Sequence, residues 1–164
     1  MINNFAGSGS PAVKSVLILG IGNISRMDDG IGIHVVNHIF ESGMSIPQNV
    51  EIIDGGMSLY DLLPVMMNRE KIIIVDALKS DDNPGTIYRF PAEYLIRTGV
   101  KDIIDQVYIA SGKIDIEIVG IVPENTDSEC INISDSLKKI IDVAAMEVLK
   151  AAGNSFDVKA NNCN

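Results

Sequence analysis

A strand, a glycine-rich loop and a helix follow one another near the start of the chain, and this unit limits the fold more than any other feature. Val16–Gly20 is a short aliphatic run that ends at glycine, which predicts a buried strand. The loop G-I-G-N-I-S-R-M-D-D-G-I-G, residues 20–32, follows. From Asp28 to about Phe40 the apolar residues repeat every four positions, which predicts a helix with an acidic first turn. The unit therefore predicts the start of an α/β domain.

The rest of the chain continues the alternation of strands and helices. The sequence predicts four further strands, at Val50–Asp54, Lys71–Ala77, Thr86–Phe90 and Ile114–Val122. It predicts helices at Leu59–Met67, at Lys101–Tyr108 and from Ser134 or Asp135 to Gly153, and an irregular loop at Glu93–Gly99. These elements indicate a three-layer α/β/α sandwich with a mostly parallel five-stranded sheet and one antiparallel strand.

Strand positions within the sheet follow from apolarity and connection length. Lys71–Ala77 is the most apolar strand, so we expect it at the centre. The connection to Thr86–Phe90 is short, so that strand must run antiparallel to Lys71–Ala77 or lie at an edge. We expect a single domain over residues 15–153, a flexible leader at 1–14 and a disordered tail at 154–164.

Composition excludes several classes of protein. The 164 residues carry a net charge of −9 with no Lys/Arg cluster, which argues against nucleic-acid binding. No apolar run approaches the roughly 20 residues that span a bilayer, and no secretory signal is evident. Cys130 and Cys163 are far apart and form neither a disulfide framework nor a zinc motif. We expect a cytoplasmic protein with incidental thiols.

The glycine loop only partly matches a dinucleotide-binding motif. Gly20 and Gly22 fit, but Ser25 occupies the position of the third glycine. Asp28 and Asp29 occupy the expected start of the helix, where a pyrophosphate needs free N–H groups and a positive dipole. Two carboxylates there repel phosphate and attract a cation. A nucleotide-binding domain is therefore the weakest interpretation of this loop.

Three acids are predicted to gather at one edge of the sheet. Asp29 follows the first strand, while Asp54 and Asp76 end the second and third. In open α/β sheets, ligands bind outside the carboxyl ends of the strands. Such a cluster suits a metal held by carboxylates, or a carboxylate that handles a proton or a water molecule. The structural alternative is that the aspartates after the loop only cap the helix.

Two histidines, His34 and His38, are spaced as in a zinc-binding H-E-x-x-H helix. Position 35 is valine, so the general base of that motif is missing, and no third ligand follows at a suitable distance. We therefore expect partly buried or surface histidines rather than metal ligands.

Four blocks in order carry a resemblance to a known family. They are G-I-G-N…D-D-G-I-G-I-H-V, E-I-I-D-G-G, I-I-I-V-D-A…N-P-G-T-I and V-G-I-V-P-E, and they span about Val16–Glu124. In order and spacing they resemble the nickel–iron hydrogenase maturation endopeptidases. The resemblance implies an α/β/α sandwich that clips a C-terminal extension from the hydrogenase large subunit after nickel insertion. It also implies that nickel, held by cysteines of the substrate, is recognised by two acids and a histidine of the protease.

Matched residue by residue, the resemblance places the two acids on Asp29 and Asp76, as catalytic and nickel-contacting residues. The family histidine is missing, since its position falls on Ile96 and no histidine follows His38. Asp54 and Arg97 are expected to contact the substrate. Arg97 or one of three acids is a candidate to replace the histidine; these acids are Glu93, Asp102 and Asp105. Two oxygen ligands without imidazole or thiolate predict weak nickel binding by the isolated protein.

The resemblance thus implies an endopeptidase that removes the C-terminal extension of a nickel–iron hydrogenase large-subunit precursor. A second hypothesis is a non-proteolytic checkpoint or chaperone that binds the same precursor and has lost turnover with the histidine. The third is the nucleotide-binding domain.

Overall fold

The computed structural model describes residues 14–95, 99–112 and 114–153. Five strands form one sheet in the order β2-β1-β3-β5-β4. The strands are β1 (Val16–Gly20), β2 (Val50–Asp54), β3 (Lys71–Ala77), β4 (Ile87–Pro91) and β5 (Asp115–Ile121). All neighbours are parallel except β4, which runs antiparallel to β5. The predicted mostly parallel five-stranded sheet is confirmed.

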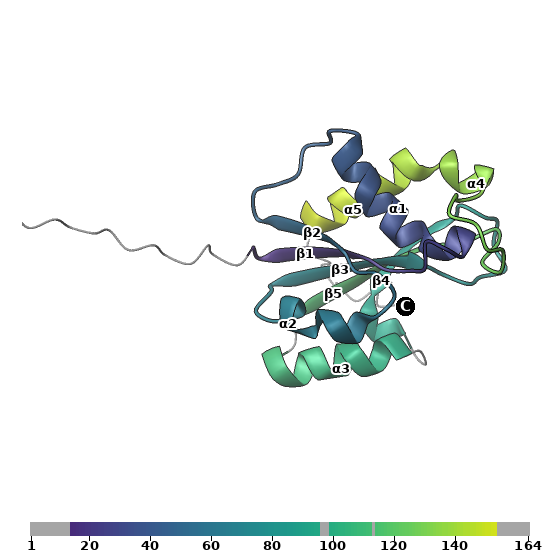
Figure 1. Cartoon of the computed structure of the whole chain (residues 1–164). Helices are drawn as coiled ribbons and strands as arrows, with labels where there is room; N and C mark the ends of the chain where they lie inside the picture. Colours follow the sequence, from purple (N-terminus) through teal and green to yellow (C-terminus); the bar gives the residue numbers. More distant parts are fainter. Residues whose placement is uncertain (1–13, 96–98, 113, 154–164) are drawn as a thin grey trace, which may run out of the picture.

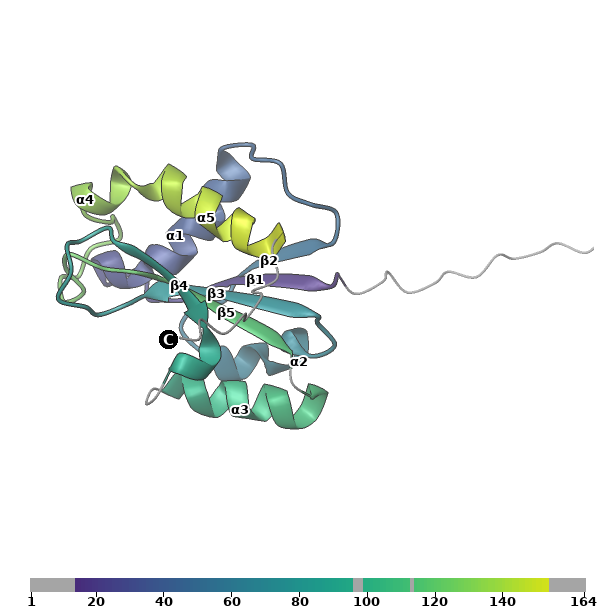
Figure 2. The same cartoon turned by 180° about the vertical axis from the view of Figure 1, so that it is seen from behind.

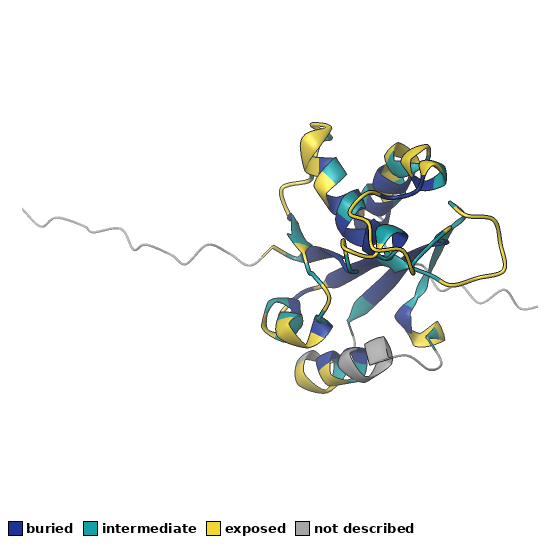
Figure 3. Ribbon diagram, turned by 45° about the vertical axis from the view of Figure 1, so that its right-hand side comes forward, coloured by how far each residue is buried: buried dark blue, intermediate teal, exposed yellow. Residues whose placement is uncertain are grey.

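Helices cover both faces of the sheet, which confirms the three-layer sandwich (Figures 1 and 2). On one face lie α1 (Ile31–Glu41), α4 (Asp135–Lys138) and α5 (Ile141–Gly153). On the other lie α2 (Leu63–Met66) and α3 (Gly99–Ser111). Each helical layer packs against one face of the sheet and forms an apolar core with it. The middle strands are therefore buried on both faces (Figure 3).

Strand β3 is central, as its apolar sequence predicts, and lies between β1 and β5. Its first five residues are all buried. The predicted strand Thr86–Phe90 is found one residue later as β4, at the edge of the sheet. It pairs with β5 rather than with β3, because β5 occupies the position beside β3. Of the two predicted placements, the edge is therefore the one that the chain adopts.

All four predicted helices have boundaries that differ from the prediction. Helix α1 begins at Ile31, and a separate 3-10 helix, η1 (Met27–Gly30), precedes it. Helix α3 is longer than the predicted Lys101–Tyr108. The predicted last helix is two helices, because Ile140 N–H bonds to the carbonyl of Leu137, three residues back, which breaks the α-helical pattern between α4 and α5.

The remaining elements are two short 3-10 helices and the short α-helix α2. The predicted helix Leu59–Met67 consists of the 3-10 helix η2 (Leu59–Leu62) followed by α2, with Pro64 at the start of α2 where its missing N–H costs nothing. A further 3-10 helix, η3 (Ala92–Tyr94), begins the predicted loop after β4. The predicted tail and residues 1–13 of the leader lie outside the described residues. Within the described part of the chain, no helix is long and apolar enough to cross a bilayer.

Candidate active site

The glycines of the loop after β1 allow close packing of backbone against backbone. A Cβ on Gly22 would lie 1.9 Å from the carbonyl oxygen of Asp29, and its φ of +139° also disfavours a side chain. A Cβ on Gly32 would lie 2.1 Å from the carbonyl oxygen of Val75. These glycines bring η1 and the start of α1 against the ends of β1 and β3. Their role is therefore explained without a bound phosphate.

Asp28 is a structural residue. It is fully buried, and its carboxylate accepts hydrogen bonds from three backbone N–H groups of the loop after β5. The donors are Glu124 at 2.9 Å, Asn125 at 3.0 Å and Ser134 at 2.6 Å. Neither η1 nor α1 has a side-chain cap, so the hypothesis that the aspartates cap the helix is wrong. Asp28 instead holds a distant loop beside the glycine loop.

We expect Asp28→Asn to lower the free energy of unfolding by about 3 kcal/mol, because one carboxylate oxygen that accepts N–H bonds is replaced by an amide donor. Asp29→Asn is the matched control. It is only half-buried and accepts one long bond, from Asn23 N–H at 3.3 Å, so its cost should stay below about 1 kcal/mol. Urea denaturation measures both values. Equal costs for the two neighbours would show that Asp28 does not hold the loop.

Asp29 and Asp76 line one hollow of about 280 Å³ at the carboxyl ends of β1 and β3. Asp29 extends from η1, and Asp76 is the sixth residue of β3. The hollow is completed by Ile21, Gly22, Asn23, Arg26 and Met57. The structure therefore brings together the two acids that the sequence analysis placed at the site.

Burial changes the protonation of Asp76. Desolvation raises the pKa of its carboxyl group from 3.8 to about 7. A hydrogen bond from Ala77 N–H, at 2.8 Å, opposes this shift, and the negative charge of Asp29 adds to it. Asp76 is therefore about half protonated at neutral pH. A cation bound between Asp29 and Asp76 would stabilise the charged form of Asp76 against both desolvation and repulsion.

This raised pKa predicts that Asp76 destabilises the fold at high pH. The unfolded chain releases the proton near pH 3.8 and the folded chain near pH 7, so the stability contributed by protonated Asp76 is lost as the pH rises through that window. Relative to the parent, Asp76→Asn should therefore gain up to about 4 kcal/mol between pH 3.5 and pH 8. Urea unfolding of both proteins across this range measures the gain. A constant difference would mean that Asp76 titrates normally.

The other predicted site residues lie apart from the hollow or outside the described residues. Asp54 ends β2, where it pairs in register with Gly20, but it is exposed and its carboxylate accepts a bond from Gly56 N–H at 3.0 Å. Ile96 and Arg97 lie outside the described residues. Their neighbour Leu95 lines a small apolar cavity of about 80 Å³ that Asp76 also lines, whereas Asp29 is not among the residues that line it.

No third metal ligand is found beside the acid pair among the side chains that the structure describes, which are those of residues 14–95, 104–110, 112 and 114–153. Among these described side chains, no group of three His, Cys, Asp or Glu could hold a metal ion. Glu93 and Asp105 are not among the described residues that line the hollow, and the side chain of Asp102 is not described. His38 bonds instead to Asp142 of α5, with Nε2 and Oδ1 2.7 Å apart.

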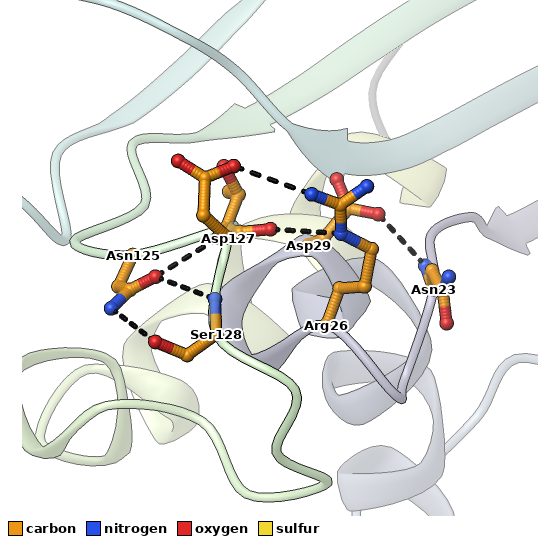
Figure 4. Close-up of polar contacts among 7 residues, drawn as sticks. Asn23, Arg26, Asp29, Asn125, Asp127 and Ser128 are labelled. Atoms are coloured by element: carbon orange, nitrogen blue, oxygen red, sulfur yellow. Dashed lines mark hydrogen bonds and ion pairs between the residues drawn. The ribbon is translucent and has the colours of Figure 1, made fainter.

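Arg26 is the residue that sequence reasoning missed. It lies in the glycine loop three residues before Asp29 and is the cation among the described residues that line the hollow. Periodicity cannot reveal it, because its side chain is held by residues about 100 positions away: Nε donates to the carbonyl of Thr126, and Nη2 contacts Asp127 (Figure 4). The only available signal was its presence in the same loop as the acids.

Comparison with known proteins connects this geometry to one group of enzymes. The family model described as hydrogenase maturation protease (HycI) matches residues 33–151. The hydrogenase 2 maturation protease of Escherichia coli strain K12 is 31% identical over 152 residues, which cover 85% of this chain and 92% of the relative.

Solved structures agree with the sequence match. The hydrogenase maturating endopeptidase HybD from E. coli has a TM-score of 0.74 and 28% identity, over 83% of this chain and 90% of that chain. The [NiFe] hydrogenase maturation protease HybD from Thermococcus kodakarensis has a TM-score of 0.70 and 25% identity, over 84% and 98% of the two chains. The similarity thus extends over nearly the whole described fold.

Proposed function

The chain belongs to the hydrogenase maturation protease family, and from this premise we propose that it is an endopeptidase that processes a hydrogenase large-subunit precursor. The observation that carries the proposal is the pair Asp29 and Asp76 in one hollow at the carboxyl edge of the sheet. These two residues match the two acids of the family in the sequence resemblance. The substrate bond is the peptide bond before a C-terminal extension of the precursor.

The finer part of the proposal concerns nickel, which is carried by the precursor. Asp29 and Asp76 offer carboxylate oxygens to the substrate's nickel, and its charge offsets their mutual repulsion. The contact fixes the scissile peptide beside the hollow. A water molecule polarised by the nickel or by a carboxylate then adds to the carbonyl carbon. The C–N bond breaks, the water's oxygen stays in the new carboxyl group, and one of its protons passes to the leaving nitrogen. Because two carboxylates are poor ligands for nickel, the isolated protein binds it weakly.

The proposal also covers the cellular compartment and the two alternative functions. We place the reaction in the cytoplasm, because the exposed free thiol of Cys130 suits a reducing compartment. The checkpoint hypothesis is a second candidate, favoured by the absence of a histidine after His38. The glycines explained by backbone packing give the nucleotide-binding hypothesis no support.

The deciding experiment incubates the protein with nickel-loaded and nickel-free precursor and measures the mass of the large subunit. We expect loss of the extension from the loaded form alone. Equal cleavage of both forms would retain the protease and reject nickel recognition. Binding of the loaded form without cleavage would establish the checkpoint. A thermal shift with nucleotides but not with precursor would favour the nucleotide-binding domain.

A further inference from the structure

Arg26 has a position that the proposed mechanism does not use. It lines the hollow beside Asp29 and Asp76, and its side chain is 50% exposed. A cation in contact with these acids would weaken the repulsion between them. In the described part of the chain, however, no ion pair joins Arg26 to either acid. The guanidinium is directed instead toward the loop after β5.

The backbone around Arg26 is fixed, whereas its side chain is held weakly. Met27 N–H donates to the carbonyl of Cys130 at 2.7 Å, and Cys130 N–H donates to the carbonyl of Ser25 at 3.1 Å. The Arg26 side chain contacts Asp127 at 3.3 Å, but the Asp127 side chain is 91% exposed. Exposed ion pairs contribute less than about 1 kcal/mol to stability. The backbone therefore places Arg26 beside the hollow, while its side chain can exchange Asp127 for another partner with little loss of free energy.

The contact between Arg26 and Asp127 joins two concave surfaces. One is the hollow with the acid pair. The other is a polar groove of about 570 Å³ between the loop after β3 and the loop after β5. Asp127 and Thr126 line this groove, while Arg26 lines the hollow, and Figure 4 shows Arg26 reaching from its own loop to Asp127. An extended polypeptide that ran along the groove to the acids would pass the guanidinium.

We infer that Arg26 is a substrate-binding residue whose guanidinium donates a hydrogen bond to a backbone carbonyl oxygen of the precursor next to the scissile bond; this rests on the proposed function. A neutral carbonyl fits better than a carboxylate. A carboxylate bound here would lie near Asp29, Asp76 and Asp127, which repel it. A carbonyl accepts the bond without that repulsion, and a charged donor strengthens it.

The test compares Arg26→Ala, Arg26→Gln and Lys150→Gln on the nickel-loaded precursor. Lys150 is the matched control: it is 61% exposed, forms one ion pair, with Glu147, and lies in the last turn of α5, outside the hollow. We expect Arg26→Ala to raise KM, and the Kd of the precursor, about tenfold, with kcat within threefold of the parent. Arg26→Gln should recover part of the loss, because an amide still donates to a carbonyl. Lys150→Gln should match the parent.

Each other outcome overturns a defined part of the inference. Parent-like KM and Kd for Arg26→Ala would remove Arg26 from substrate binding. If Arg26→Gln is as weak as Arg26→Ala, and if the parent's advantage shrinks with added salt, the bound group is a carboxylate. If kcat falls alone, Arg26 acts on the reacting group. If the parent does not cleave, the proposed function fails, while the Kd comparison still tests Arg26.

Discussion

Asp76→Asn is expected to reduce cleavage of the nickel-loaded precursor by at least about 100-fold without unfolding the protein. Asparagine keeps the volume of the side chain and an oxygen that can accept the hydrogen bond from Ala77 N–H, which is 2.8 Å away. It removes the negative charge that would face the substrate's nickel and the carboxylate that would polarise water. Because the buried carboxyl destabilises the fold above neutral pH, the variant should also be more stable than the parent there.

Steady-state cleavage, followed by the mass of the large subunit, measures this effect. Asp135→Asn is the control, since Asp135 lies on α4 and its side chain is 87% exposed in an ion pair with Lys138. This variant makes the same chemical change on the surface, away from the hollow, and should cleave at the parent rate. If Asp76→Asn also cleaves at the parent rate, then Asp76 is only structural and the acid pair does not form the site.

The approximate position of the acid pair was predictable because it follows from strand order. Parallel strands end at one edge, and β1 and β3 are neighbours, so Asp29 and Asp76 had to lie near each other. The same rule does not fix side-chain direction. Asp54 ends the strand on the other side of β1, but its carboxylate turns back to Gly56 N–H. Its proposed contact with substrate therefore stays a prediction.

The contacts that distinguish Asp28 from Asp29 were not predictable. The two residues are adjacent and chemically identical, yet one is fully buried and the other faces the hollow. The difference arises from the loop that contains Glu124, Asn125 and Ser134, about 100 residues further along the chain. Local periodicity carries no information about such a partner. For the same reason Arg26 could not be assigned from the sequence.

Glu117 shows a further limit of pattern reasoning. Acids alternate with isoleucines in I-D-I-E-I, a pattern typical of a strand with one face in water. In the structure the face that carries Glu117 is covered by α5, and Glu117 is fully buried. Its carboxylate lies 2.7 Å from Arg89 Nε and 3.1 Å from Lys71 Nζ. A buried ionic cluster is therefore found on the face of the strand that the alternation predicts to be exposed to solvent.

Glu117→Ala is expected to lower the free energy of unfolding by about 3–5 kcal/mol, because it leaves two poorly exposed cations without their shared carboxylate. The side chains of Lys71 and Arg89 are only 7% and 23% exposed, so water cannot fully replace the lost partner. Asp135→Ala, which breaks an exposed ion pair, should cost less than about 1 kcal/mol. Urea denaturation of both variants gives the comparison.

A double variant separates the net contribution of the cluster to the free energy of unfolding from the penalty of removing one of its members. Replacement of a whole buried ion pair by apolar residues often leaves the stability almost unchanged. Removal of only one partner is strongly destabilising, because the other charge stays buried and uncompensated. Glu117→Met combined with Arg89→Met should therefore lose less stability than the sum of the two single changes, while Asp115 still pairs with Lys71 at 3.3 Å. Additive losses would mean that Glu117 and Arg89 stabilise the fold independently, by packing rather than by charge.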